Sequence, residues 1–156
     1  MVTEIPHSIV ETVRELDQKG LNRGSTGNCS ARTDSGSFLI TPSGIASTEV
    51  SGDCLVRVQL GAESAPPEHR WQGRTYLASS EWRFHRDIYR ARPEVGAVVH
   101  VHSTFATSLA CTRRGIPAFH YMVAIGGGAD IRCAEYADYG RSEEHTSELQ
   151  SRQYLV

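Results

Sequence analysis

Residues 97–102, AVVHVH, constrain the fold of this chain more than any other stretch. Their valines predict a β-strand, because β-branched side chains fit the pleated surface of a sheet. Alternate residues of a strand share a face, so His100 and His102 project together while Val99 and Val101 face the opposite way. The pair can present two imidazoles to one zinc-like ion, or it can be two exposed or hydrogen-bonded histidines on a half-buried strand.

The third ligand of such a metal site is not evident among the histidines. A catalytic zinc ion usually takes three protein ligands and keeps one position open. His7 falls in the first predicted helix and His69 in a polar loop. His85 and His120 remain candidates, but we expect each to pack or to form hydrogen bonds instead.

The rest of the chain alternates predicted helices and strands. The helical spacing of Ile9, Val13 and Leu16 predicts a helix over about residues 6–19, with Gly20 as its C-terminal cap. Further along, we expect β-prone runs at 24–33, 37–44 and 54–60, a polar loop at 61–71, a helix from Ser79 or Ser80 to before Pro93, a strand at 95–103 and a helix at 104–115. This alternation indicates an α/β or α+β layered domain.

The composition allows one domain and excludes several classes of protein. The 156 residues suffice for one compact domain with a core. A formal net charge of -2 without a basic stripe argues against nucleic acid, and no apolar run reaches the roughly 18 residues of a membrane span. The N-terminus lacks the pattern of a signal peptide, and Cys29, Cys54, Cys111 and Cys133 form no C-x-x-C motif. We therefore expect a cytoplasmic protein with free thiols.

Glu81 is the next candidate for chemistry, because it follows two serines where a helix is predicted to start. Free N–H groups at that terminus and the hydroxyls of Ser79 and Ser80 can hold a phosphate, with Glu81 placed to transfer a proton. The alternative is a serine N-cap followed by a first-turn glutamate, which stabilises any helix. Taken alone, this stretch favours the alternative.

Two loops are similar to anion-binding turns. In STGNCS, Gly27 and Asn28 place backbone N–H groups and an amide where they can reach a ligand, and Thr41 and Gly44 do the same in TPSG. Ordinary turns are made of the same residue types. The glycines of residues 125–130, IGGGAD, fit neither G-x-G-x-x-G nor a P-loop, so they predict a flexible turn.

Together these motifs resemble the class II aldolase/adducin family, and most of all its fuculose-phosphate aldolase branch. The matching motifs, in the family's order over about residues 5–140, are GLNRGSTGNCSAR, LITPSG, SSEWRFH, RPEVGAVVHVHS, IPAFHYM and YADYG. The resemblance implies a three-layer α/β/α sandwich with a central, mainly antiparallel sheet. It also implies a zinc-dependent retro-aldol cleavage of a ketose 1-phosphate, such as L-fuculose 1-phosphate, to dihydroxyacetone phosphate and an aldehyde.

The resemblance also assigns roles to residues of this chain. It implies that His100 and His102 are two of three metal histidines, and that Glu81 is the catalytic glutamate, which can also approach the metal. Tyr121 matches a tyrosine that assists proton transfer from a neighbouring subunit, which implies a homotetramer when full length. The resemblance implies Zn²⁺ as the metal, and another divalent transition metal would suit the same ligand types. The substrate and phosphate contacts match Gly27, Asn28, Thr41, Gly44, Ser79 and Ser80.

Residues 141–156, RSEEHTSELQSRQYLV, do not continue the family's pattern. They resemble the translation of a common short-read sequencing adapter, codon for codon, and an ordinary polar helix is the alternative. We therefore expect a partial family domain over residues 1–140 and a non-native tail over 141–156. The family's third metal histidine lies beyond the segment that ends at Gly140, so we expect this chain to lack it and to be inactive, poorly folded or both.

Other functions stay open within and outside the family. A ribulose-5-phosphate 4-epimerase uses a similar metal and recombines the fragments, whereas a methylthioribulose-phosphate dehydratase eliminates water. An adducin-like interaction module keeps the fold without catalysis, and we expect such a module to lack His100 and His102. A metal-binding module without catalysis is the last alternative.

Overall fold

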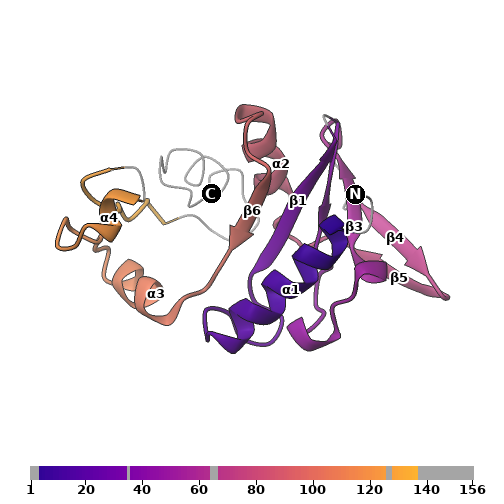
Figure 1. Ribbon diagram of the computed structural model, residues 1–156, viewed down its shortest axis with the longest axis horizontal. Coiled ribbons are helices and arrows are strands. Elements are labelled where there is room, and N and C mark those ends of the chain that lie inside the picture. The colour runs from indigo at the N-terminus through magenta and orange to yellow at the C-terminus, as the bar shows by residue number, and fades with distance from the viewer. Residues whose placement is uncertain (1–3, 35, 64–66, 126–127, 137–156) are drawn as a thin grey trace. The chain divides into compact units, whose positions relative to one another are not determined.

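The computed structural model describes residues 4–34, 36–63, 67–125 and 128–136 (Figure 1). The chain divides into two compact units, Met1–His102 and Ser103–Val156. The elements of the first unit are α1 (Glu4–Gln18), β1 (Asn28–Asp34), β2 (Ser37–Ile40), the short helices η1 (Ser47–Glu49) and η2 (Gly52–Cys54), β3 (Val56–Gln59), β4 (Glu68–Trp71), β5 (Arg74–Leu77), α2 (Trp82–Ala91) and β6 (Ala97–His100). Those of the second unit are α3 (Thr104–Cys111) and α4 (Met122–Ile125).

A four-stranded sheet in the order β3-β2-β1-β6 lies at the centre of the first unit. All its neighbouring strands are antiparallel, and on β1 Ser30 is paired with Ile40 of β2 and Val98 of β6. The same register places Asn28, the first residue of β1, opposite His100, the last residue of β6. The central antiparallel sheet that the resemblance implies is confirmed.

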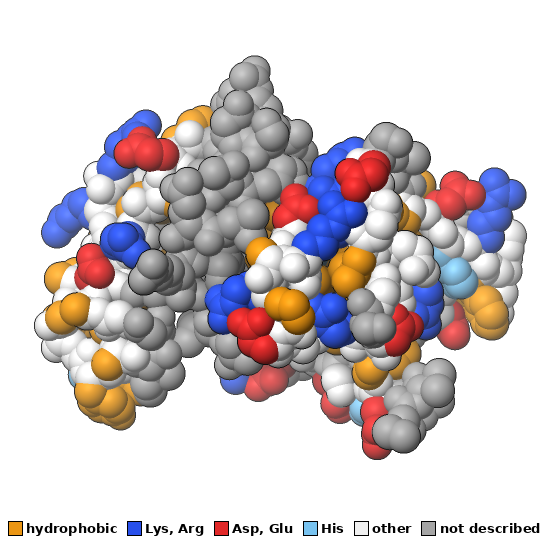
Figure 2. Space-filling model, turned by 90° about the horizontal axis from the view of Figure 1, so that it is seen from above, with side chains coloured by type: hydrophobic (Ala, Val, Ile, Leu, Met, Phe, Trp, Pro, Cys, Tyr) orange, Lys and Arg blue, Asp and Glu red, His pale blue; other side chains and the backbone are white. Residues whose placement is uncertain are grey.

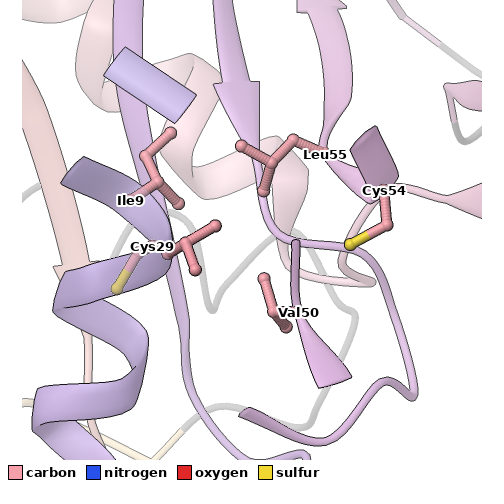
Figure 3. Close-up of a cluster of buried hydrophobic side chains, with 6 residues drawn as sticks. Ile9, Cys29, Val50, Cys54 and Leu55 are labelled. Carbon is pink, nitrogen blue, oxygen red and sulfur yellow. The ribbon is translucent and has the colours of Figure 1, made fainter. Parts of the chain in front are cut away.

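Helix α1 covers one face of this sheet with an apolar stripe (Figure 3). The predicted helix over residues 6–19 is confirmed as Glu4–Gln18, and Gly20 follows it at φ +68°. Ile9 lies 3% exposed beside Cys29 of β1, which is equally buried. The buried cluster consists of Ile9, Val10, Cys29, Val50, Cys54 and Leu55.

Helix α2 covers the opposite face. Cys29 belongs to the cluster under α1, whereas its neighbour Ser30 hydrogen-bonds to His85 and Tyr89 of α2. Because successive strand residues point to opposite faces, the two helices lie on different sides of the sheet. The rings of Phe38 and Tyr89 meet at 4.9 Å between centroids in the α2 layer. The result is the predicted α/β/α arrangement.

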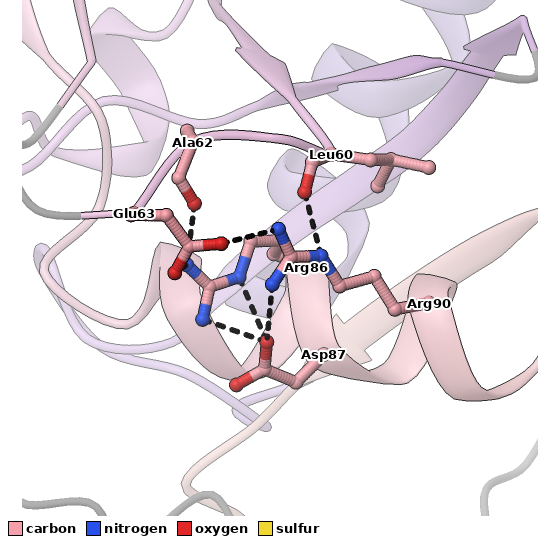
Figure 4. A network of polar contacts seen from close by, with 6 residues as sticks. All are labelled: Leu60, Ala62, Glu63, Arg86, Asp87 and Arg90. Carbon is pink, nitrogen blue, oxygen red and sulfur yellow. Dashed lines mark hydrogen bonds and ion pairs between the residues drawn. The ribbon is translucent and has the colours of Figure 1, made fainter.

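Two arginines of α2 hold the segment that follows β3 (Figure 4). The Arg86 side chain, 9% exposed, donates to the carbonyl of Ala62 at 2.5 Å and pairs with Asp87 at 2.7 Å. Arg90 donates to the carbonyl of Leu60 at 2.6 Å. A charge this deeply buried requires such partners, so these contacts fix where α2 lies over the sheet.

The prediction of a polar loop over residues 61–71 is wrong at its end. There β4 pairs with β5 in an antiparallel hairpin, whose two-residue turn has Gln72 at φ +46° and Gly73 at φ +77°. Positive φ at both central positions is the turn geometry that matches the twist of paired strands. The strand carries charged, mostly exposed side chains, so it lacks the apolar alternation that marks strands in sequence.

The second unit contains the helix predicted over residues 104–115, which ends earlier, at Cys111. None of its side chains is buried among the described residues, and Phe105 is 84% exposed. None of the described helices of the chain has the length and apolar character needed to cross a membrane. On the face shown in Figure 2, acidic and basic side chains of the described residues lie interspersed. All four cysteines are free.

Candidate metal centre

Glu81, His100 and His102 converge at the end of β6. The Nε2 atoms of the two histidines lie 3.0 Å apart, and Glu81 Oε1 lies 3.5 Å from His100 Nε2. One ligand atom of each residue lies within 4.8 Å of the others. The strand predicted over residues 95–103 is shorter than expected, since β6 ends at His100, and His102 lies just beyond the ladder. The two imidazoles nevertheless face the same point, as the alternation predicts.

These three residues fit a divalent metal ion. Ligand atoms bound tetrahedrally at 2.0–2.1 Å from zinc lie about 3.3 Å from one another. The separations of 3.0 Å and 3.5 Å bracket that value. Two imidazoles and a carboxylate suit zinc and several other divalent transition metals, so Glu81, His100 and His102 could hold such an ion.

Glu81 occupies the N-cap position of α2, where Ser79 or Ser80 was expected. Its side chain makes no capping hydrogen bond, although its N–H donates to the Ser79 hydroxyl at 3.3 Å. The carboxylate, 11% exposed, is instead directed toward Asn28 and the histidines. The first-turn glutamate that merely stabilises a helix therefore does not describe this residue.

Asn28 links Glu81 to a buried histidine. The Asn28 amide nitrogen donates to Glu81 Oε2 at 2.5 Å, and its oxygen lies 2.5 Å from His85 Nε2. Burial lowers the pKa of His85 well below 6.5, and the nearby His100 lowers it further, so the ring is neutral. The expectation that His85 forms hydrogen bonds is confirmed.

Asn22 holds the backbone on which both histidines stand, and the sequence patterns did not single it out. Its side-chain oxygen accepts the N–H of His102 at 2.8 Å, and its amide donates to the carbonyl of His100 at 3.4 Å. Gly27, at φ +69°, makes room for it, since a Cβ there would lie 2.2 Å from the Asn22 nitrogen. An asparagine in a turn is common, so only the fold reveals this contact.

The predicted phosphate contacts fall into two groups. Gly27, Asn28 and Thr41 line one cavity, in which Thr41 is buried and accepts the N–H of Cys29 at 3.2 Å. Outside that lining, Gly44 forms a turn at φ +71° and Ser79 is buried with its N–H donating to the Thr41 carbonyl at 3.0 Å. The last predicted phosphate contact is Ser80, which is exposed. Tyr121, which was predicted to assist proton transfer, precedes α4 in the second unit and is 73% exposed.

Residues 7–154 match the class II aldolase and adducin N-terminal domain. The chain belongs to this family. The resemblance seen in the motifs is therefore confirmed. The expected boundary at Gly140 lies outside the described residues, and the family match continues past it.

Curated relatives of this chain include aldolases. The chain is 46% identical over 137 residues to a 5-methylthioribulose-1-phosphate/5-deoxyribulose-1-phosphate aldolase of Rhodospirillum rubrum, covering 88% of this chain and 58% of that protein. It is 38% identical over 146 residues to the L-fuculose phosphate aldolase of Escherichia coli strain K12, covering 92% and 64%. The chain thus spans less than two thirds of the length of these curated relatives.

A solved class II aldolase structure has the same fold. An L-fuculose 1-phosphate aldolase matches with a TM-score of 0.80 at 34% identity, over 93% of this chain and 65% of that one. Class II aldolases are metal-dependent lyases that act on phosphorylated sugars, and the cluster of Glu81, His100 and His102 is the candidate metal site in this chain.

Proposed function

We propose that this chain carries much of the active site of a metal-dependent aldolase that cleaves a ketose 1-phosphate to dihydroxyacetone phosphate and an aldehyde. The observation that carries the proposal is the convergence of Glu81, His100 and His102 on one point. A divalent ion held there supplies Lewis-acid stabilisation of the negative charge that develops when the carbon–carbon bond breaks.

Glu81 is placed to return a proton to the carbon left by bond cleavage. Its Oε2 accepts a hydrogen bond from Asn28, whereas Oε1 faces His100. Oε1, on the histidine side, is the oxygen left for the metal or for a proton, so it takes the proton when the carboxylate is not a metal ligand. Tyr121 of a neighbouring copy assists proton transfer in a cytoplasmic homotetramer.

Neutral donors hold the substrate phosphate. They are the N–H and O–H groups of Gly27, Asn28, Thr41, Gly44, Ser79 and Ser80. The amide of Asn28 has two hydrogens, of which one is given to Glu81, so the second can reach a phosphate. Such an anchor orients a small substrate over the metal site.

Two substrate classes are supported by relatives. The 46% identical relative acts on 5-methylthioribulose 1-phosphate and 5-deoxyribulose 1-phosphate, and the 38% identical one on L-fuculose phosphate. The higher identity favours a 5-substituted or 5-deoxy ribulose 1-phosphate, although the motifs of the chain are most similar to the fuculose-phosphate branch. Both substrates require the same cleavage and the same dihydroxyacetone phosphate product.

The first experiment is a genomic read of the gene past codon 140, with adapter sequence removed. We expect a continuation that supplies a further histidine, and a genomic copy of RSEEHTSELQSRQYLV followed by a stop would contradict the assignment of that segment as an adapter. The continued protein and the 156-residue chain are then assayed in parallel. Turnover by the 156-residue chain would contradict the expectation that it lacks a ligand.

The product identifies the reaction. With Zn²⁺ and each ketose 1-phosphate, we expect an aldehyde and dihydroxyacetone phosphate; an epimer or a dehydrated ketone would instead show the epimerase or the dehydratase. Glu81→Gln should lower turnover about 100-fold or more while metal still binds, because the amide cannot carry the proton. Unchanged turnover in Glu81→Gln would overturn the role of Glu81, and a complete lack of turnover in the continued wild-type protein would favour a binding module.

A further inference from the structure

A continuous chain of buried hydrogen bonds runs from Glu81 into the layer under α2. Beyond Asn28, His85 Nδ1 lies 2.7 Å from the hydroxyl of Ser30, which lies 2.8 Å from that of Tyr89. Asn28, Ser30, His85 and Tyr89 are each at most 5% exposed. Burying this many polar groups costs free energy unless each one is paired, and here each has a partner.

The chemistry of the groups fixes the direction of every bond. An ionised carboxylate only accepts, so Asn28 must turn its NH₂ group to Glu81 and its oxygen to His85. His85 Nε2 therefore carries the ring hydrogen, and Nδ1 of the neutral ring accepts from Ser30. Ser30 in turn accepts from Tyr89, whose phenol oxygen also hydrogen-bonds to the Val98 backbone. All the donors point toward Glu81.

We propose that His85 is a positioning residue for Glu81: its Nε2–H holds the Asn28 amide, which in turn holds Oε2 and directs Oε1 to His100. The inference rests on the proposed metal site. If Asn28 were not held, its amide could rotate and present oxygen to the carboxylate, which would repel it. His85 touches neither substrate nor metal in this arrangement, so it acts only through Asn28.

Two substitutions of His85 separate positioning from packing. His85→Phe keeps a ring of similar size and removes both nitrogens, whereas His85→Gln keeps an amide N–H that can donate to Asn28. On the 156-residue chain, titration calorimetry with Zn²⁺ should show affinity about 10-fold lower for His85→Phe and close to wild type for His85→Gln. Ile88→Val removes one methyl group from the same buried layer, so it measures what a packing loss alone does and should leave affinity unchanged.

Nitrogen-15 NMR of the metal-free chain gives a readout that does not depend on the metal. We expect His85 to be protonated at Nε2 and not at Nδ1, and the Asn28 side-chain NH₂ to be protected from exchange in wild type and in His85→Gln but not in His85→Phe. If the wild-type chain binds no Zn²⁺, Glu81, His100 and His102 do not suffice to hold the ion in this chain, while these signals still decide the positioning role.

Any of three results would overturn the inference. The first is a His85 ring protonated at Nδ1 in the wild-type chain. This measurement can be made even if the His85→Phe variant does not fold. The second is a folded His85→Phe variant that keeps both the protected Asn28 amide and wild-type Zn²⁺ affinity. Equal losses of affinity in His85→Gln and His85→Phe would likewise show that the imidazole acts by packing alone.

Discussion

The two faces of strand β1, whose seven residues are NCSARTD, differ in what they contact. Cys29 faces α1 in an apolar cluster, whereas Asn28 and Ser30 face α2 in hydrogen bonds that lead to Glu81. Because successive residues of a strand alternate between faces, one short segment can support the fold on one side and the site on the other. The effect of a substitution should therefore depend on which face it alters.

The largest effect on stability is expected under α1. Ile9→Ala should lower the free energy of unfolding by about 2–5 kcal/mol, because Ile9 is 3% exposed and its removal leaves a cavity. The Zn²⁺ affinity of the molecules that remain folded should not change. Denaturant unfolding and calorimetry measure the two quantities, and Ile9→Val should give a smaller loss of about 0.5–1.5 kcal/mol. A fall in affinity as large as that of His85→Phe would show that the two faces are not independent.

A second prediction concerns the support of His100 and His102. Gly27→Ala should lower the free energy of unfolding for two reasons. Alanine is strained at a φ of +69°, and its Cβ would clash with the side chain of Asn22. In an Asn22→Ala background the clash is gone, so the two changes should couple by about 0.5–3 kcal/mol. Gly20→Ala is the matched control, since Gly20 has φ +68° and nothing within 4 Å of an added Cβ. Additive losses for Gly27 and Asn22 in denaturant unfolding would contradict the contact.

The parts of the fold that depend on residues close together in the sequence could be predicted. The apolar spacing in α1 and the two-residue spacing of His100 and His102 are local patterns, and the structure bears both out. The meeting of Glu81 with these histidines depends on the pairing of β1 with β6 and on the position of α2. No spacing encodes it, and only the family resemblance suggested it.

The residues that support the site were not predictable for the same reason. Asn22 reaches a backbone 80 residues away, and His85 reaches Asn28 across 57. A histidine inside an amphipathic helix and an asparagine in a turn have many ordinary roles. The hairpin of β4 and β5 was missed because β4, EHRW, has no apolar alternation and β5, RTYL, is only 4 residues long.

The smallest expected effect, a pH dependence, also separates the two faces. Burial lowers the pKa of His85 well below 6.5, so the unfolded chain binds a proton there before the folded chain does. The contribution of the neutral His85 ring to the free energy of unfolding is therefore complete above about pH 6.5. As the pH falls below this value, the free energy of unfolding decreases by at most about 1.4 kcal/mol per pH unit. Unfolding of the metal-free protein at pH 7, 6 and 5 measures this slope, and His85→Gln should flatten it.

Cys29, on the α1 face, supplies the control. Burial raises the pKa of its thiol to about 12, so Cys29 is neutral in both folded and unfolded chains throughout the acid range. Cys29→Ala should lower stability by a similar amount at every pH and leave the acid slope intact. If Cys29→Ala flattened the slope and His85→Gln did not, the acid sensitivity would not come from the polar chain under α2, and the division between the two faces of β1 would fail.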